Sequence, residues 1–410
     1  MRILASAVFT FSALSSLASS SSAFAKGTPV LADLAALQSL GVPLIAKDEV
    51  IGVGVARLSE EDQLRLLGAN HARGKCAGFE ALSEGASILD AREARIELGQ
   101  LRARVDAESK AASVRRRAIL VEKNPEIVAA LSELKEDNLR ANVAWLSSYP
   151  NRDNRSTDPN AHIGDFTRKL SEILKEYPGQ SAIDTIGHTK TRQKSVRVRL
   201  VGKSRPDEII VLGGHLDSIN QWGGSSKKAP GADDNASGSA NLLETLRVLS
   251  GHGVPERTVE FFWYAGEESG LLGSAEIAKQ YKKEQKNVIA VLQLDMTMFP
   301  GAGEFVIASM TDFTSQWLRD YLVAINDVYI HAKITQDRCG YGCSDHASWF
   351  RQGYPTLMPF EAGMDTMNNK IHTEGDQIDE QSNFRHSLQF SQIALVFALD
   401  LGNSAQQQGY

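Results

Sequence analysis

The sequence predicts an α/β protein with a mixed, largely parallel central sheet that is flanked by helices. Three short apolar runs, at residues 207–218, 257–266 and 287–296, are typical of buried strands. Two segments with helical spacing, at residues 237–253 and 269–284, lie between these runs. Strands that alternate with helices in this way usually form a parallel sheet whose faces the helices cover.

The remaining elements of this part of the chain fit the same fold. Residues 124–149 have helical spacing, and Pro125 suits the first turn of a helix, where its missing N–H is not needed. Residues 195–202 alternate between polar and apolar side chains, which indicates a strand. The predicted helix at 237–253 ends at a glycine, a common helix terminator.

The chain has 410 residues, enough for one large core and a smaller domain. Residues 1–25 have the pattern of a secretory signal peptide, with Arg2, a moderately apolar stretch and an Ala-Phe-Ala cleavage pattern, so we expect export to the periplasm or the medium.

Residues 26–120 combine short strand-like pieces with a long charged helical stretch and are predicted to form a separate N-terminal domain that resembles a propeptide. Its arginine run at 115–117 fits a solvated helix face or a processing site. We expect residues 121–405 to form the main domain.

The composition gives no sign of a nucleic-acid or membrane partner, and the predicted export suggests a role for the cysteines. The net charge of −6 gives no reason to expect nucleic acid, and after the signal peptide no stretch approaches membrane length. An exported protein favours a local disulfide between Cys339 and Cys343, which would close a tight loop around Tyr341. A thiolate metal site is the alternative, and Cys76 is left as a free thiol.

Acids and histidines follow three of the predicted strands at the point where each strand ends. Because ligands of open α/β sheets bind beyond the carboxyl ends of the strands, we expect these side chains to converge. They are His215, Asp217, Glu267, Glu268 and Asp295, joined from connecting segments by Asp233, Asp234 and His372, with His346 as a competing candidate. Each has an ordinary explanation by itself, such as a helix cap at Asp234 or a solvated helix start at Glu267 and Glu268.

Together, these carboxylates would repel one another at one sheet edge unless a cation held them there. Imidazole with carboxylate, and no thiolate, suits Zn²⁺ or a similar first-row metal. The acids outnumber the three protein ligands of a single catalytic zinc, so two bridged ions fit better. Such two-metal sites serve hydrolases.

The motifs carry a family resemblance. The segments GGHLDS, APGADDNASG, YAGEESGLLGS, LQLDM, CGYGCSDHASW and IHTEGD occur in the order seen in the M28 family of zinc aminopeptidases. The likeness spans about residues 125–400 and resembles most the secreted bacterial leucyl aminopeptidases of the Vibrio type. It implies a zinc exopeptidase fold of the phosphorylase/hydrolase type, and the N-terminal domain resembles the propeptides of that group in position only.

The resemblance implies a role for each matched residue. His215 and Asp295 would hold one zinc, Glu268 and His372 the other, and Asp234 would bridge the two ions. Glu267 would be the general base, Asp217 would orient His215, and Tyr341 would contact the reacting carbonyl. Met296, Met358, Phe360, Met364 and Ile371 match the hydrophobic substrate pocket. The chain departs from the family at Asn235, which is not a ligand position, and at Met364 and Met367, where some relatives have aromatic residues.

The site residues and the resemblance both predict peptide hydrolysis. The resemblance further implies cleavage at the N-termini of peptides, with a preference for leucine or other hydrophobic residues. We expect a monomer with two zinc ions per chain and no nucleic-acid or membrane partner, whose own propeptide could act as an inhibitor or folding aid. Two alternatives share the fold: a zinc-dependent glutaminyl cyclase, which is an acyltransferase, and a dinuclear carboxypeptidase or deacylase.

Overall fold

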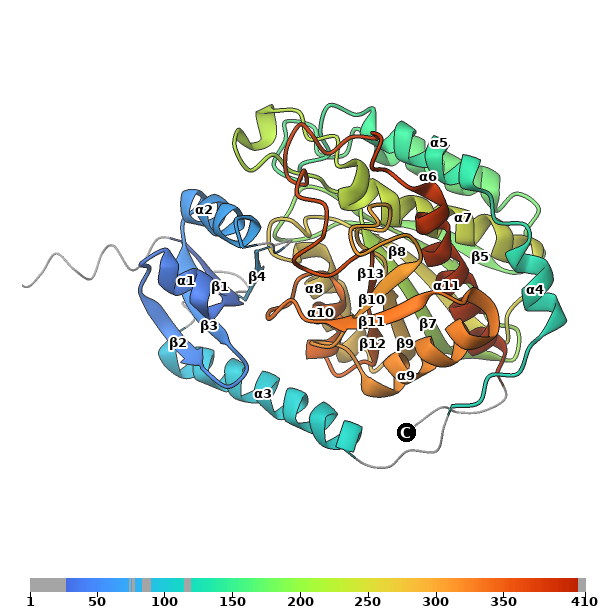
Figure 1. The fold of residues 1–410 in the computed structure, drawn as a ribbon, viewed down its shortest axis with the longest axis horizontal. Helices are drawn as coiled ribbons and strands as arrows, with labels where there is room; N and C mark the ends of the chain where they lie inside the picture. The colour runs from blue at the N-terminus through green and yellow to red at the C-terminus, as the bar shows by residue number, and fades with distance from the viewer. Residues whose placement is uncertain (1–26, 74, 76–77, 83–89, 114–118, 405–410) are drawn as a thin grey trace, which may run out of the picture.

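The structure, a computed structural model, describes residues 27–73, 75, 78–82, 90–113 and 119–404 (Figure 1). The predicted signal peptide, Cys76 and the arginine run at 115–117 lie outside these residues. None of the described helices combines the length and the apolar composition that a membrane crossing requires.

A six-stranded mixed sheet forms the centre of the main domain. Its strands lie in the order β12-β9-β7-β8-β6-β5. The four strands from β12 to β8 are parallel, as the sequence predicts, whereas β6 and β5 pair antiparallel at one edge. The bounds are β5 Ser181–Ile186, β6 Ser195–Leu200, β7 Arg205–His215, β8 Arg257–Tyr264, β9 Asn287–Gln293 and β12 Thr356–Leu357.

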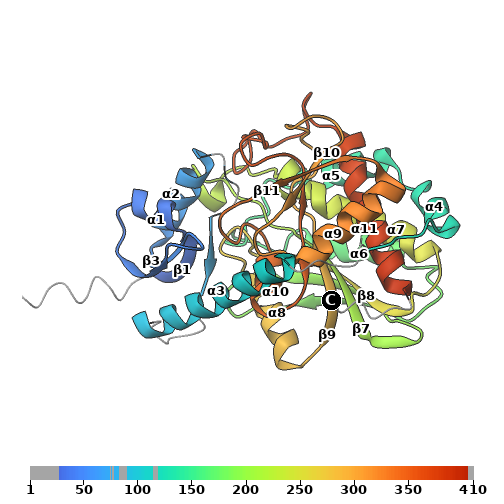
Figure 2. The same cartoon turned by 60° about the horizontal axis from the view of Figure 1, so that its bottom comes forward.

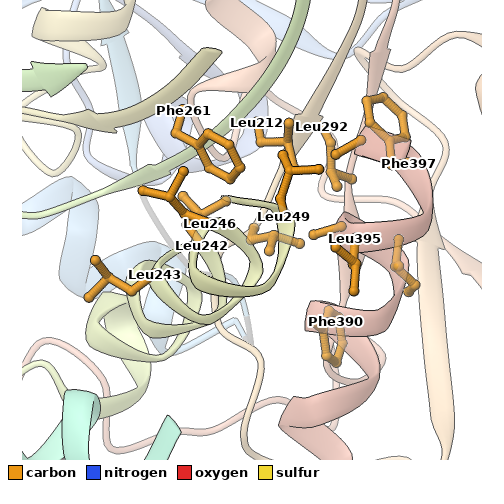
Figure 3. Close-up of a cluster of buried hydrophobic side chains, with 14 of the residues drawn as sticks. Leu212, Leu242, Leu243, Leu246, Leu249, Phe261, Leu292, Phe390, Leu395 and Phe397 are labelled. Carbon is orange, nitrogen blue, oxygen red and sulfur yellow. The ribbon is translucent and has the colours of Figure 1, made fainter. Parts of the chain in front are cut away.

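Helices cover both faces of this sheet because successive side chains of a strand point to opposite sides. Ile210 and Leu212 of β7 belong to a large apolar core with α7 and α11, and Figure 3 shows Leu212 in that core beside leucines of α7. Ile209 and Val211 of the same strand pack instead with residues of α8 and α10. The helices of this domain are α4 Pro125–Leu131, α5 Glu136–Ser147, α6 Ile163–Ile173, α7 Gly238–Gly251, α8 Leu272–Lys283, α9 Gln316–Ile325, α10 His346–Arg351 and α11 Phe384–Asn403.

Most of the predicted elements are confirmed, and one differs. The segment 124–149 contains two helices, α4 and α5, separated by residues 132–135. Asn124 caps α4 by accepting a hydrogen bond from the Glu126 N–H, and Pro125 occupies the first turn, as predicted. The break lies where the buried Glu244 carboxylate accepts the Lys135 N–H, which ends one helix and starts the next.

A small three-stranded sheet lies beside the main sheet, in the order β11-β10-β13. Its strands are β10 Val306–Met310, β11 Lys333–Asp337 and β13 Pro359–Phe360. The segment after β11 carries the two cysteines of the CGYGC motif, and the segment after β13 carries Met364 of the predicted pocket. Met358 stands directly before β13.

The N-terminal unit, which we define as the described residues of 28–113, has its own four-stranded antiparallel sheet in the order β2-β3-β1-β4. Its elements are β1 Thr28–Asp33, α1 Leu34–Ser39, β2 Leu44–Asp48, β3 Val53–Leu58, α2 Glu60–His71, β4 Phe79–Ala81 and α3 Ala91–Ser113. The unit lies at the left of the main domain in Figure 1. Figures 1 and 2 show that α3 extends from the unit along the main domain.

The unit is joined to the main domain by apolar and charged contacts. Leu31, Val53 and Leu98 share one buried cluster with Leu271 and Phe350 of the main domain. Arg351 of α10, whose side chain is 9% exposed, reaches back to the unit with two ion pairs, at 2.8 Å to Glu80 and at 2.7 Å to Glu97.

Candidate metal centre

The carboxyl ends of three parallel strands bring the predicted site residues together. His215 is the last residue of β7, Glu267 and Glu268 follow β8, and Asp295 follows β9. Asp234 comes from the turn that enters α7, and His372 comes from the loop before α11. All six residues are buried, none more than 5% exposed.

Five of these six residues, all except Glu267, form two groups of three that share Asp234. Within each group the ligand atoms lie within 4.8 Å of one another, and the groups are His215, Asp234, Asp295 and Asp234, Glu268, His372. Oδ1 of Asp234 is 3.0 Å from Nε2 of His215, whereas its Oδ2 is 3.0 Å from Nε2 of His372. Each oxygen of Asp234 thus faces a different histidine, as a bridging ligand of two ions must.

The donor set fits metal cations. Among the described residues, no hydrogen-bond donor meets Oε1 of the buried Glu268 or Oε1 of Glu267. Oε2 of Glu268 lies 3.0 Å from Nε2 of His372, which is itself a candidate ligand. A buried carboxylate without a donor is costly unless a cation compensates it. The ligand atoms are imidazole nitrogens and carboxylate oxygens, which suit Zn²⁺.

The pKa shifts of the site residues show that the site favours bound positive charge. Burial raises the pKa of Glu268 to about 7 and that of Glu267 well above its ordinary value. Burial alone would lower the pKa of His215, but the Asp295 carboxylate raises it well above 6.5, and Glu268 has the same effect on His372. Without metal ions, protons therefore supply the charge that the acids require.

Asp217 lies beside His215, the residue that it is expected to orient, and it also accepts two backbone hydrogen bonds. Its Oδ1 is 3.5 Å from Nδ1 of His215, whose closer contact is the carbonyl oxygen of Asp217 at 3.1 Å. The two carboxylate oxygens accept the N–H groups of Glu267 and Glu268, at 3.0 and 3.2 Å. Asp217 therefore fixes the backbone of both glutamates.

Sequence reasoning missed several residues that support the ligands. Ser195 Oγ and Gln193 Oε1 accept the N–H groups of Ala265 and Gly266, each at 3.0 Å, and so complete the support of the turn after β8. Ser344 donates a hydrogen bond of 2.6 Å to Asp295, and Asp376 accepts the N–H groups of Asp233 and Asp234. Ser344 and Asp376 lie within motifs that the sequence does single out, whereas nothing local marks Gln193 or Ser195.

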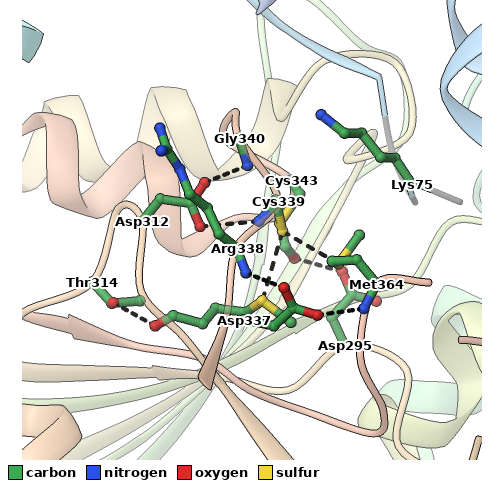
Figure 4. The surroundings of a disulfide bond; sticks show 12 residues. Lys75, Asp295, Asp312, Thr314, Asp337, Arg338, Cys339, Gly340, Cys343 and Met364 are labelled. Atoms are coloured by element: carbon green, nitrogen blue, oxygen red, sulfur yellow. Dashed lines mark hydrogen bonds between the residues drawn. A yellow bond between two sulfur atoms is a disulfide. The ribbon is translucent and has the colours of Figure 1, made fainter. Parts of the chain in front are cut away.

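The predicted pocket residues form a single buried cluster beside this centre. Cys339 and Cys343 are joined by a disulfide, and the loop that it closes holds Tyr341, which is 1% exposed (Figure 4). The cluster contains Met296, Met358, Phe360, Met364 and Ile371 together with Met367, Tyr341 and both cysteines. His346, the competing ligand candidate, is buried at the start of α10 and belongs to neither ligand group.

The N-terminal unit reaches this part of the main domain. The ring centroid of His71, at the end of α2, is 6.5 Å from that of His372. The ammonium group of Lys75 lies 5.3 Å from the centroid of the Tyr341 ring and is held by an ion pair of 2.8 Å with Asp33. Figure 4 shows Lys75 extending toward the disulfide loop.

Comparison with known proteins identifies the family of the chain. Residues 195–398 match the model of peptidase family M28. Leucine aminopeptidase 1 of Leptosphaeria maculans is 36% identical over 291 residues, which cover 68% of this chain and 74% of that protein. The chain belongs to peptidase family M28.

Two solved structures extend the comparison of this M28 peptidase. The LapA aminopeptidase of Legionella pneumophila is 25% identical, with a TM-score of 0.77, and the match covers 92% of this chain and 99% of that chain. So broad a match must include much of the N-terminal unit. A glutaminyl cyclase of Bacteroides thetaiotaomicron has a TM-score of 0.52 at 15% identity over 65% of this chain and 98% of that chain, which reflects a shared fold alone.

Proposed function

We propose that this M28 peptidase is an exported aminopeptidase that uses two zinc ions to release hydrophobic N-terminal residues, leucine above all, from peptides. The observation that carries the proposal is the shared Asp234, whose two oxygens face two separate imidazole and carboxylate groups. The leucine aminopeptidases at 36% identity support the same activity.

Each group of the centre has a part in this mechanism. His215, Asp234 and Asp295 would hold one ion, and Asp234, Glu268 and His372 the other. When bound, the ions supply a Lewis acid for the scissile carbonyl and lower the pKa of the attacking water. Glu267 accepts the proton of that water and delivers it to the leaving amine. The Tyr341 hydroxyl donates a hydrogen bond to the oxygen on which negative charge develops.

The cluster beside the centre supports the preference for hydrophobic residues. Met296, Met358, Phe360 and Ile371 are each at most 1% exposed and bring no charge to the predicted pocket. A leucine side chain gains from leaving water in such surroundings, whereas a lysine or glutamate side chain would lose its hydration.

The exopeptidase proposal is tested with paired substrates. We expect the purified mature protein, freed of its N-terminal unit, to release p-nitroaniline from Leu-p-nitroanilide. It should leave the N-acetylated form uncut, because the free amine is what the centre recognises. Activity on the Lys and Glu anilides should be lower by at least about tenfold, since a buried charge costs well over 1.4 kcal/mol.

Two other results would support the alternatives. Cleavage of the blocked substrate would indicate a carboxypeptidase or deacylase, and cyclisation of an N-terminal glutamine peptide would indicate a glutaminyl cyclase.

We further propose that the N-terminal unit is a propeptide that keeps the uncut chain inactive. Support comes from His71 and Lys75, which lie beside His372 and Tyr341, and from the burial of the whole centre. The disulfide between Cys339 and Cys343 supports export, because such bonds persist in oxidising compartments. A monomer remains our expectation.

The inhibitory role predicts activation when the N-terminal unit is loosened. Changing Glu80 and Glu97 together to glutamine leaves the nearly buried Arg351 without its charged partners, a loss worth about 3 kcal/mol. We expect the uncut variant to hydrolyse Leu-p-nitroanilide at least about tenfold faster than the uncut wild type. Glu49→Gln is the matched control, because Glu49 is exposed and forms an ion pair with Lys47 of the same unit rather than with the main domain. Equal rates in the wild type and the double variant would contradict the inhibitory role.

A further inference from the structure

One buried arginine of the main domain has no acidic partner. Arg152 is 1% exposed, and its guanidinium forms no ion pair with any described carboxylate. Instead, all its bonds go to backbone carbonyl oxygens. The Nε atom donates to Leu216 at 2.7 Å, Nη1 donates to Leu146 and Pro230 at 2.9 and 2.6 Å, and Nη2 donates to Gly231 at 2.9 Å.

Those carbonyl groups belong to segments that carry the ligands. Leu216 stands directly after His215, and Pro230 and Gly231 begin the turn that holds Asp234. A Cβ atom on Gly231 would lie 2.8 Å from Nη2 of Arg152, and the residue has a φ of +54°, so glycine is required for this approach. The guanidinium thus binds the His215 segment to the Asp234 segment.

The main chain of Arg152 adds a third segment. Its carbonyl oxygen accepts a hydrogen bond of 2.8 Å from Nε2 of Gln193, a residue with no exposed surface. Oε1 of the same glutamine accepts the Gly266 N–H at 3.0 Å, directly before Glu267 and Glu268. Gln193 therefore ties the glutamate turn to Arg152.

The charge of Arg152 also matches its surroundings. A buried cation without a paired acid is costly, unless nearby negative charge compensates it. Burial lowers the pKa of Arg152 to about 10, and the acids Asp376, Asp217 and Asp234 oppose that shift. Arg152 therefore remains charged at neutral pH, and the acids of the metal centre stabilise it from a distance.

We propose that Arg152 is a positioning residue of the metal centre, which sets the affinity for the metal ions by fixing three ligand-bearing segments relative to one another. This inference rests on the proposed two-metal function. Supporting groups of this kind change metal affinity by about 10–100-fold when they are removed, because misaligned ligands no longer meet the ion together.

The test is the affinity of the full chain for zinc, measured on metal-free protein by competition with a chromophoric chelator. Arg152→Lys keeps the charge but loses the planar fork that reaches four carbonyl groups. We expect its zinc affinity to fall by about 10–100-fold, while circular dichroism shows a folded protein. A folded Arg152→Lys protein with wild-type zinc affinity would overturn the inference.

Arg257→Lys is the matched control. Arg257 is likewise 1% exposed, but it is the first residue of β8 and contacts Glu208 near the start of β7 and the end of α11 at Leu401 and Ser404. The ligands instead follow the opposite, carboxyl ends of these strands. We expect Arg257→Lys to lower the melting temperature and to leave zinc affinity unchanged. An equal loss of zinc affinity in both variants would show that Arg152 stabilises the fold in general and not the metal centre in particular. That result would overturn the inference.

A second variant decides the matter if Arg152→Lys does not fold. Gln193→Met keeps the volume of the side chain but leaves the Gly266 N–H without its acceptor, and we expect zinc affinity to fall about tenfold. Unchanged affinity in this variant would overturn the proposal. A wild-type protein that binds no zinc at all would instead refute the proposed function, so the two failures are distinguishable.

Discussion

Glu267→Gln is expected to abolish turnover while both zinc ions stay bound. Glutamine keeps the size of the side chain but cannot accept a proton, and a general base contributes about 10²–10⁴-fold to such a rate. The change should not disturb the turn, because Asp217 holds the Glu267 backbone N–H rather than its side chain. The measurement is kcat/KM on Leu-p-nitroanilide, together with elemental analysis of the same sample.

Glu244→Gln is the control for this experiment. Glu244 is also buried, but it lies on α7 and contacts Arg247, Lys135 and Asn138 instead of the metal centre. We expect the folded control to keep near-normal activity. Near-normal activity of Glu267→Gln itself would show that the base assignment is wrong.

Glu268→Ala is expected to lose a metal ion as well as activity. Glu268 is one of three ligands in its group, and Oε2 lies 3.0 Å from Nε2 of His372. Its removal leaves the second ion with one carboxylate and one imidazole, so we expect about one zinc per chain instead of two, with activity lower by at least about 10³-fold.

The zinc content of the two variants distinguishes the general base from the metal ligand. Glu267→Gln should keep two zinc ions and Glu268→Ala should not, although the residues are adjacent and equally buried. Retention of two zinc ions per chain by Glu268→Ala would refute its role as a ligand.

The convergence of the ligands could be predicted because it depends on a simple rule of sheet geometry. His215, Glu267 and Asp295 each follow a parallel strand, and such strands all end at the same edge of the sheet. Alternation of strands and helices was enough to predict this part of the fold. The antiparallel edge formed by β5 and β6 could not be predicted, because alternation within one strand does not reveal the direction of its neighbour.

The supports of the centre were beyond sequence reasoning for a different reason. Gln193 and Arg152 act through backbone groups of residues far away in the chain, and these contacts exist only in the folded protein. Neither residue type is unusual in a loop, so no local pattern marks them. The same holds for the N-terminal unit, whose long charged helix was predictable as α3, whereas its position beside Tyr341 was not.

The central claim is that two zinc ions in this centre drive aminopeptidase activity. The test is to remove all metal with a chelator from the mature protein, freed of its N-terminal unit, and to titrate zinc back while Leu-p-nitroanilide hydrolysis is followed. We predict that the metal-free protein is inactive and that activity rises to a plateau at two zinc ions per chain. Full hydrolysis by the metal-free protein, or a plateau at a single ion, would contradict this account.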